Sequence, residues 1–360
     1  MCDIKAARET INKADKEIAK LFTERMHAVR KVFAYKKEHG LPIFDERRER
    51  ELLRKNTEYI EDAVLKEYYI NFQKNVMEVS KRYQARLQSG IRVAYSGIKG
   101  AFAHIAAMKL YPDSEKKSYP NFASAYEAVE NGECDIALLP IENSNAGEVG
   151  EVTDMIFRRS LYINGMYSLA VNQNLLALPS ASCSTIKTVI SHPQALSQCE
   201  EHLKNAGYEI REAANTAKAA KEVAESGDNT LAAIASAETA ELYGLKILER
   251  NINKSRVNTT KFAVLSRVMP QNEDCCSVIM FAVSNNAGSL AKAINVIGKY
   301  GFNMTSLRSR PLQGHPWKYY FYVETDKSVN TELGKTMLRE LSEHCDMLKA
   351  AGCFKEGGVL

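Results

Sequence analysis

The chain has 360 residues, of which 45% are hydrophobic and 26% charged, and its formal net charge is +4 at pH 7. This length predicts two or three domains, and this composition excludes a disordered or fibrous chain. The basic excess is concentrated in residues 1–90, which hold 20 basic and 15 acidic residues. Such a mild excess favours an anionic small molecule over nucleic acid, which would require a strongly basic face.

The sequence also bears on compartment and metal content. No apolar run approaches the ~18 to 20 residues of a membrane span, and the start lacks the pattern of a signal peptide, so we expect a cytoplasmic protein. The eight cysteines are scattered and none forms C-x-x-C, while Cys275 and Cys276 are adjacent. This usage favours reduced thiols over a disulfide framework or a zinc site.

Residues 1–90 predict three helices and no strand. Apolar residues recur every three or four positions from Ile4 to about Tyr35, which is typical of one long helix with a heptad seam. The segment His39-Gly40-Leu41-Pro42 ends that helix, and Asp45 suits the start of a short second one. A third helix is expected from about Asp62 to Leu87.

Arg25 lies in the apolar seam of the first helix, where a permanent charge is costly unless an anion meets it. Lys36 lies about 16 Å further along the same helix and about 20° round it, so both side chains can reach one small molecule. Arg8 lies about 25 Å from Arg25 and can serve such a site only in a second chain. Alternatively, Arg25 extends to solvent or pairs with a structural glutamate.

Polar residues on the other two helices complete a pattern that resembles the all-helical chorismate mutase family over residues 3–86. The shared spacings are R-x16-R-x10-K, D-x2-R-E and S-x3-Q, and the matching residues are Arg8, Arg25, Lys36, Asp45, Arg48, Glu49, Ser80 and Gln84. The resemblance implies an intertwined dimer in which Arg8 crosses to the partner's site. It further implies that Arg8 and Arg25 hold the substrate carboxylates, that Asp45 and Glu49 hold hydroxyl or nearby polar groups, and that Lys36 and Gln84 contact the ether oxygen. Taken alone, each polar pair is typical of a solvated helix face.

The chemistry of that family fits a basic helical pocket. The rearrangement of chorismate to prephenate is unimolecular and needs no proton transfer, nucleophile or cofactor. Confinement of the dianion in its compact conformer and donors at the ether oxygen both lower the barrier.

Residues 91–268 alternate short apolar runs with helical stretches. The apolar runs include IRVAYSG, CDIALLP, KTVISHP, LAAIA and KFAVLSR. This order predicts an α/β domain with a largely parallel sheet, ligand sites at strand ends and, from its length, two lobes. The glycines after the first run lack the G-x-G-x-x-G spacing, which argues against a nicotinamide cofactor.

Hydroxyl, amide and imidazole side chains gather at the predicted strand ends. They occur in Glu142-Asn143-Ser144, in Ser191-His192-Pro193-Gln194 and in Asn258-Thr259-Thr260-Lys261-Phe262. Taken singly, Asn143, Ser191 and Thr216 are equally compatible with turns and helix caps, and His192 with an ordinary loop histidine.

Four segments in chain order, YSGIKGAFAHIAA, LLPIENSNAGEV, ISHPQALSQC and NTTKFAVL, resemble the prephenate dehydratase family over about residues 92–267. The resemblance implies an active site in the cleft between two lobes, with Thr260 as the essential residue. Lys261 stands where the family has arginine, so the positive charge persists without the bidentate fork. The expected site comprises Asn143, Ser144, Ser191, His192, Gln194, Thr216, Thr260, Lys261 and Phe262.

Dehydration of prephenate releases carbon dioxide and the ring hydroxyl and creates an aromatic ring. The driving force is therefore large, and the protein mainly assists departure of hydroxide. The Thr260 hydroxyl is a candidate acid or hydrogen-bond catalyst if a polar relay supports it. The substrate carboxylates need cations or amide donors nearby, and His192 is a candidate relay. The candidates to hold the carboxylates are Lys261, Asn143, Ser144, Ser191, Gln194 and Thr216.

Residues 276–360 predict the order strand, helix, strand, strand, helix, strand, which is typical of a ferredoxin-like βαββαβ fold. The segment NNAGSLAKAINVIGKYGFNMTSLRSRP resembles the ACT family of amino-acid-sensing modules. The resemblance implies a phenylalanine site made by Gly288, Ser289, Leu290, Ala291, Leu307, Ser309, Arg310 and Pro311, where helix N-terminal amides would hold a carboxylate. Arg308 stands where the family usually has glutamate. The alternative is a module that only dimerises the chain.

The three regions, 1–90, 91–268 and 276–360, follow the order found in the family of bifunctional chorismate mutase/prephenate dehydratases. We therefore expect conversion of chorismate to prephenate and then to phenylpyruvate, with feedback by phenylalanine and without metal or cofactor. Expected partners are these substrates, phenylalanine and further copies of the chain, but neither nucleic acid nor a membrane. The alternatives are a non-catalytic sensor of amino or aromatic acids and a mutase with weak dehydratase activity.

Overall fold

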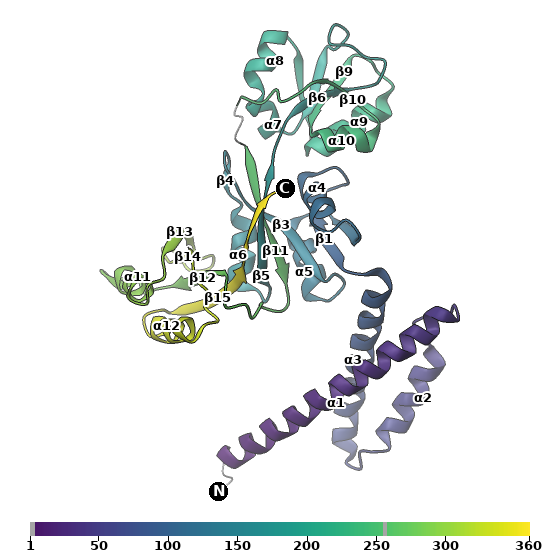
Figure 1. The fold of residues 1–360 in the computed structure, drawn as a ribbon, viewed down its shortest axis with the longest axis vertical. Helices are drawn as coiled ribbons and strands as arrows, with labels where there is room; N and C mark the ends of the chain where they lie inside the picture. The colour runs from purple at the N-terminus through teal and green to yellow at the C-terminus, as the bar shows by residue number, and fades with distance from the viewer. Residues whose placement is uncertain (1–3, 255–257) are drawn as a thin grey trace. The chain divides into compact units, whose positions relative to one another are not determined.

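The computed structural model of the chain describes residues 4–254 and 258–360. The chain divides into two compact units, Met1–Ile91 and Arg92–Leu360 (Figure 1). Among the described residues, no helix combines the length and the apolar character needed to cross a membrane.

The first unit consists of the three predicted helices. They are α1 (Ile4–Glu38), α2 (Glu46–Thr57) and α3 (Ala63–Ser89). Aspartates start the two later helices, as preferred N-cap residues do: the Asp45 carboxylate accepts from the Arg48 amide at 3.0 Å, and the Asp62 carboxylate accepts from the Val64 amide at 2.8 Å. Helix α3 packs against both α1 and α2.

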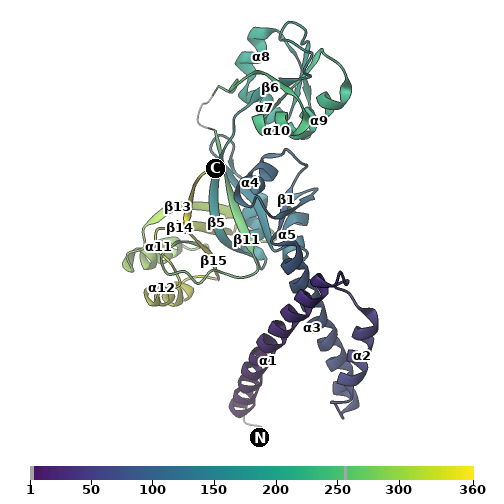
Figure 2. The same cartoon turned by 45° about the vertical axis from the view of Figure 1, so that its right-hand side comes forward.

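The heptad seam of α1 stays largely uncovered within one chain. Ile4, Ile11 and Leu21 are 65%, 58% and 59% exposed, and Phe33 is the one buried residue of this 35-residue helix. In both ribbon views the N-terminal half of α1 extends away from α2 and α3 (Figure 2). A row of exposed apolar residues along one face of a helix is suited to packing against another helix.

The second unit begins with a lobe built on five strands. These are β1 (Arg92–Ser96), β2 (Glu115–Tyr119), β3 (Ile136–Asn143), β5 (Tyr162–Ala170) and β11 (Thr259–Ser266), in the order β5-β11-β3-β1-β2. Only β11 runs against its neighbours in this set. The lobe also contains helices α4 (Phe102–Leu110), α5 (Phe122–Glu130) and α6 (Gly150–Arg158), and the short β4 (Gly147–Glu148) pairs with β3.

The second lobe is a separate five-stranded sheet with its own helices. Its strands β6 (Asn174–Ala177), β7 (Thr188–Ser191), β8 (Glu209–Glu212), β9 (Leu231–Ala235) and β10 (Lys246–Glu249) lie in the order β10-β6-β9-β7-β8. Its helices are α7 (Pro193–Gln198), α8 (Glu200–Ala206), α9 (Thr216–Ser226) and α10 (Ala237–Tyr243). The lobes touch where the Thr239 and Tyr243 hydroxyls donate to the carbonyls of Gly100 and Lys99, at 2.8 and 2.7 Å.

The C-terminal segment has the predicted βαββαβ order. It comprises β12 (Cys276–Ala282), α11 (Ser289–Lys299), β13 (Met304–Pro311), β14 (Tyr319–Thr325), α12 (Glu332–Ser342) and β15 (Met347–Phe354), with strands in the antiparallel order β13-β14-β12-β15. Strand β15 joins this sheet to the first lobe by pairing with β5 at Gly352 and Ile163, and β16 (Glu356–Val359) continues along β5. A Cβ at Gly352 would lie 2.2 Å from the Ile163 carbonyl oxygen, so the close approach requires glycine.

The two faces of β12 belong to two different cores. Ile279 and Phe281 pack in a cluster that includes residues of α11 and α12. Val278 and Met280 point the other way, into a cluster shared with Ile156 of α6 and other residues of the first lobe. The C-terminal module therefore shares a hydrophobic core with the first lobe.

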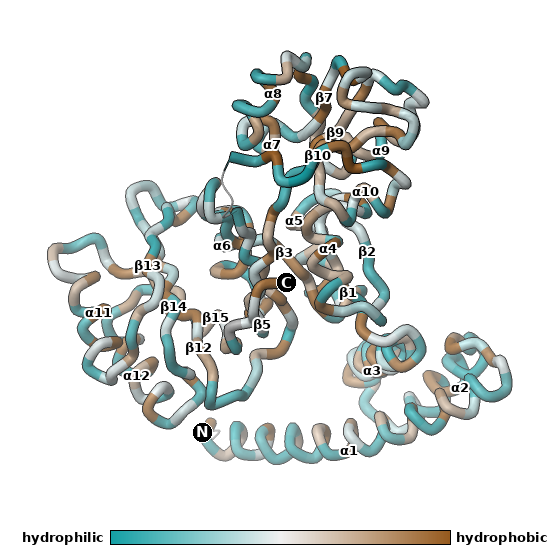
Figure 3. Tube along the Cα trace, turned by 45° about the horizontal axis from the view of Figure 1, so that its top comes forward, coloured by the Kyte–Doolittle hydropathy of each residue, from teal (hydrophilic) through white to brown (hydrophobic). Residues whose placement is uncertain are grey.

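Figure 3 shows hydrophobic residues along β3 and β9 and mostly hydrophilic ones along α1.

His104 gives the first lobe a pH-dependent contribution to stability. Its Nδ1 accepts the Gly100 amide at 3.2 Å, and burial, together with Lys99 and Lys116, lowers the pKa of His104. The unfolded chain then binds more protons than the folded one as the pH falls through the ordinary value of about 6.5, so this contribution is lost on acidification. His104→Asn keeps an acceptor but cannot titrate. Between pH 7.5 and 5.5, the wild type should lose a few degrees more in Tm than the variant; an equal loss would contradict the argument.

Candidate functional site

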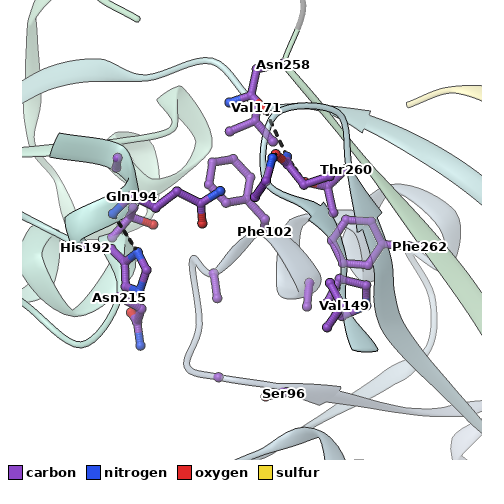
Figure 4. Close-up of a pocket in the computed structure, with 18 of the residues that line it drawn as sticks. Ser96, Phe102, Val149, Val171, His192, Gln194, Asn215, Asn258, Thr260 and Phe262 are labelled. Carbon is purple, nitrogen blue, oxygen red and sulfur yellow. Dashed lines mark hydrogen bonds between the residues drawn. The ribbon is translucent and has the colours of Figure 1, made fainter. Parts of the chain in front are cut away.

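A cavity of about 480 Å³ opens between the two lobes of the second unit (Figure 4). Both lobes supply its walls. Residues from the first lobe and the connections between the lobes include Ser96, Phe102, Asn143, Glu148, Val149, Gln173, Asn258, Thr260 and Phe262, and those from the second lobe include His192, Gln194, Gln198, Asn215 and Thr216. Of the expected dehydratase residues, the structure brings six to this cavity: Asn143, His192, Gln194, Thr216, Thr260 and Phe262.

Thr260 is held with its hydroxyl proton available. The Asn143 amide nitrogen donates to Thr260 Oγ1 at 3.0 Å and to Asn258 Oδ1 at 2.9 Å. The Asn143 amide oxygen accepts the backbone amides of Asn145 and Ala146, each at 3.0 Å, which fixes which end of the amide faces Thr260. Because the Thr260 oxygen accepts from Asn143, its own proton can be donated to a molecule in the cavity.

The polar relay continues across the cavity. Asn258 is 3% exposed, and its amide nitrogen donates to Gln198 Oε1 of α7 at 3.0 Å. The hydrogen-bonded chain Thr260, Asn143, Asn258 and Gln198 thus joins β11 and β3 to the second lobe. Asn258 and Gln198 were not among the expected site residues, although both lie in the two segments that carried the family resemblance.

The second-lobe wall is formed by helix starts. The His192 ring Nδ1 accepts the Gln194 amide at 3.2 Å, so this side chain caps α7 as well as lining the cavity. Thr216 is the first residue of α9, and the side chain of Asn215 caps that helix by accepting from the Lys218 amide at 2.7 Å. The N-terminus of α9 is suited to a carboxylate of a bound anion.

Three expected dehydratase residues do not line the cavity. Ser191 is fully buried and donates to the Ile234 carbonyl at 2.7 Å, and the Ser144 hydroxyl oxygen accepts the Thr259 amide at 3.0 Å. Lys261 follows Thr260 on β11, and neighbouring residues of a strand point to opposite faces. Its ammonium lies 3.3 Å from the Glu324 carboxylate, so in this geometry Lys261 does not reach the cavity in which it was predicted to anchor a substrate carboxylate. Among the described residues, the cavity wall holds no lysine or arginine, and its donors are amides, hydroxyls and the His192 imidazole.

In the helical unit, Arg25 of α1 donates to the Ser80 hydroxyl of α3. Burial lowers the pKa of Arg25. Gln84 is 7% exposed and its amide nitrogen donates to the Ser80 carbonyl at 3.3 Å, whereas its buried Oε1 has no hydrogen-bond partner among the described residues. An unpaired buried oxygen is costly, so a donor that is not part of the described chain, such as a water molecule, a ligand or a second chain, is expected at Gln84 Oε1.

Apart from Arg8, the remaining mutase residues have local partners in one chain. Lys36 donates to the Ile43 carbonyl at 2.7 Å, and Glu49 pairs at 3.3 Å with Lys81 of α3, which was not among the predicted site residues. Arg48 pairs with Glu51 at 3.3 Å and Asp45 caps α2. Arg8 is exposed near the start of α1. A single chain therefore brings Arg25, Ser80 and Gln84 together without Arg8.

The expected phenylalanine residues divide between two faces of the C-terminal module. Gly288 precedes α11 with φ 83°, and the Ser289 hydroxyl lies 3.0 Å from that of Ser284, while Leu290 and Ala291 continue the helix. Leu307, Ser309 and Pro311 are exposed along the edge strand β13. Arg310 points to the opposite face, where its guanidinium meets Asp154 at 2.9 Å and Glu148 at 3.4 Å, and these contacts raise its pKa.

Comparison with known proteins gives two family matches. Residues 7–85 match the model of chorismate mutase type II, and residues 93–270 match that of prephenate dehydratase. A bifunctional chorismate mutase/prephenate dehydratase of Escherichia coli (strain K12) is 31% identical over 99% of this chain and 97% of its own length. An arogenate dehydratase/prephenate dehydratase from Arabidopsis thaliana is 38% identical over 74% of this chain and 73% of its own. Among solved structures, a prephenate dehydratase from Arthrobacter aurescens in complex with L-Phe covers 74% of this chain and 90% of its own, with a TM-score of 0.68 and 24% identity.

Proposed function

The chain belongs to the family of bifunctional chorismate mutase/prephenate dehydratases, and on this premise we propose where and how each of its two activities proceeds. As a member of this family it is an enzyme of phenylalanine biosynthesis, acting as an isomerase on chorismate and as a lyase on prephenate. The proposal assigns the mutase to residues 1–90, the dehydratase to 91–268 and regulation to 276–360. Its main support is the Thr260 hydroxyl, which faces the cavity between the lobes with its proton available.

For the dehydratase, Thr260 donates a hydrogen bond or proton to the ring hydroxyl as it leaves. The Asn143 amide supports this by donating to the Thr260 oxygen, and Asn258 and Gln198 extend the support across the cavity. The carboxylates of prephenate are received by neutral donors, including the N-terminus of α9 at Thr216 and the side chain of Gln194. Loss of carbon dioxide and hydroxide then yields phenylpyruvate.

For the mutase, Arg25 holds a carboxylate of chorismate, and Lys36 and Gln84 contact the ether oxygen. Asp45, Arg48, Glu49 and Ser80 complete the pocket. Arg8 comes from a second chain, because it lies about 25 Å from Arg25 along one helix. The uncovered apolar seam of α1 supports this dimer, since a second copy would bury it.

The C-terminal module is proposed to be an ACT domain that binds phenylalanine. Support comes from its βαββαβ order and from the L-Phe complex of the Arthrobacter aurescens protein, which has the same fold as the second unit. The effector site would combine the start of α11, at Gly288 to Ala291, with Leu307, Ser309 and Pro311 on β13. We further propose that the protein forms a homo-oligomer of at least two chains and is cytoplasmic.

A coupled turnover assay tests these assignments. The purified chain, dialysed free of added ions and nucleotides, is given chorismate, and prephenate and phenylpyruvate are followed with and without phenylalanine. We expect both products in sequence and a lower phenylpyruvate rate with phenylalanine. Accumulation of prephenate alone would contradict the dehydratase assignment, and binding without any product would favour a sensor. A parallel reaction with arogenate is needed because the Arabidopsis thaliana relative is named both an arogenate and a prephenate dehydratase. A higher kcat/KM for arogenate than for prephenate would make arogenate the preferred substrate.

A further inference from the structure

The strand pair that carries Thr260 and Asn143 has a second, charged face. Thr260 is paired in register with Asn143, and the next pair along β11 and β3 is Lys261 with Glu142. Thr260 and Asn143 line the cavity, whereas Lys261 and Glu142 do not. The two pairs therefore share one stretch of backbone, and whatever holds the second pair also positions the first.

The C-terminal module supplies an opposite charge to each member of the second pair. Arg308 of β13 donates to the Glu142 carboxylate at 2.6 Å, and Glu324 of β14 lies 3.3 Å from the Lys261 ammonium. Tyr322 connects the two contacts: its hydroxyl donates to Glu324 at 2.8 Å, and its ring lies 5.4 Å from the Arg308 guanidinium carbon. Glu142, Lys261, Arg308 and Glu324 thus form one cluster of alternating charge.

The cluster is constrained on the module side. Glu324 and Tyr322 are 4% and 2% exposed, so their positions are fixed within the sheet of the module. The module is in turn anchored to the first lobe by the shared hydrophobic core and by Phe157, whose ring stacks on Tyr320 with centroids 4.4 Å apart. A rigid support on one side of the cluster transmits its position to the strands on the other.

We infer that Arg308 and Glu324 are positioning residues for dehydration: through Glu142 and Lys261 they hold the β3 and β11 backbone so that Thr260 and Asn143 keep their mutual geometry. This inference rests on the proposed role of Thr260 and adds to it a dependence on the C-terminal module. It also gives Lys261 a role in which its ammonium contacts the module and never the substrate.

Arg308 and Glu142 are the better pair to test, because the Glu142 side chain is 33% exposed and can be solvated when its partner is lost. Removing Lys261 would instead leave the buried Glu324 carboxylate unpaired. The variants are Arg308→Gln, Glu142→Gln, the double variant and Arg308→Lys. The matched control is Lys299→Gln, which removes a cation that pairs with Glu340 at 2.8 Å inside the same module.

We expect each single neutral variant to lower kcat for prephenate roughly tenfold, with KM changed less than twofold, because misplacement of the reacting groups affects the chemical step. The double variant should lose about as much as either single one, since both act through one contact. Arg308→Lys should keep most of the dehydratase activity, and Lys299→Gln should keep all of it. Every variant should keep the wild-type mutase rate.

Unchanged kcat in Arg308→Gln or in Glu142→Gln would overturn the inference. So would a roughly hundredfold loss in the double variant, which would show independent effects, or an equal loss of mutase activity, which would show a general folding defect. Thr260→Ala, measured in the same assay, distinguishes a failure of the proposed function from a failure of this inference. If Thr260→Ala still dehydrates prephenate, the proposed function fails; if it is inactive while the Arg308 and Glu142 variants are normal, only this inference fails.

Discussion

Replacing Thr260 with alanine should lower kcat for prephenate dehydration by roughly two to four orders of magnitude, the usual contribution of a positioned proton or hydrogen-bond donor. The structure gives the reason: the Thr260 oxygen already accepts from Asn143, so the hydroxyl proton is the group left to assist the departing hydroxide. The rest of the relay survives the change, because Asn143 still donates to Asn258. Rates of prephenate loss and phenylpyruvate formation measure the effect.

Two comparisons make this experiment specific. Thr260→Ser keeps a hydroxyl on the same strand and should retain most of the activity. Chorismate consumption by Thr260→Ala should stay at the wild-type rate, since the mutase residues belong to the other compact unit. A Thr260→Ala variant that still forms phenylpyruvate at more than about a tenth of the wild-type rate would exclude the hydroxyl as the main acid.

The helices and strands could be predicted because their signals are local. The seam of α1, the capping residues Asp45 and Asp62 and the alternation of strands and helices after Gly90 all depend on neighbours in the sequence. Thr260 and Asn143 were also predicted for the site, and the structure joins them by a hydrogen bond of 3.0 Å. Sequence periodicity does not show which distant residues meet in the fold. The family resemblance supplied that information for Thr260 and Asn143.

The direction of charged side chains could not be predicted in the same way. Lys261 and Arg310 were both predicted to belong to ligand sites, yet each points to the other face of its strand and meets a carboxylate from a distant segment. Arg308 and Lys261 are the two positions at which the sequence departs from the family patterns, and nothing in the sequence connects them. In the structure they belong to one cluster, because β13 and β14 pass beside β3 and β11.

Mixed dimers of Arg8→Ala and Arg25→Ala chains should recover mutase activity that neither variant has alone. Each single variant should lose about two to three orders of magnitude in kcat, as expected when one charge-stabilising donor is removed. If each pocket takes Arg25 from one chain and Arg8 from the other, a mixed dimer holds one complete pocket and one that lacks both arginines. Purified mixed dimers should then have about half the wild-type mutase activity per dimer.

Co-expression with two different affinity tags yields the mixed dimers, and prephenate formation from chorismate measures the recovery. Dehydratase activity on added prephenate should be normal in all three preparations, which controls for damage to the fold. The structure makes the shared pocket reasonable, because Arg8 is exposed on α1 between the uncovered seam residues Ile4 and Ile11. Mixed dimers as inactive as the single variants would remove the shared pocket. Near-normal mutase activity of Arg8→Ala alone would show instead that one chain builds the pocket without its partner.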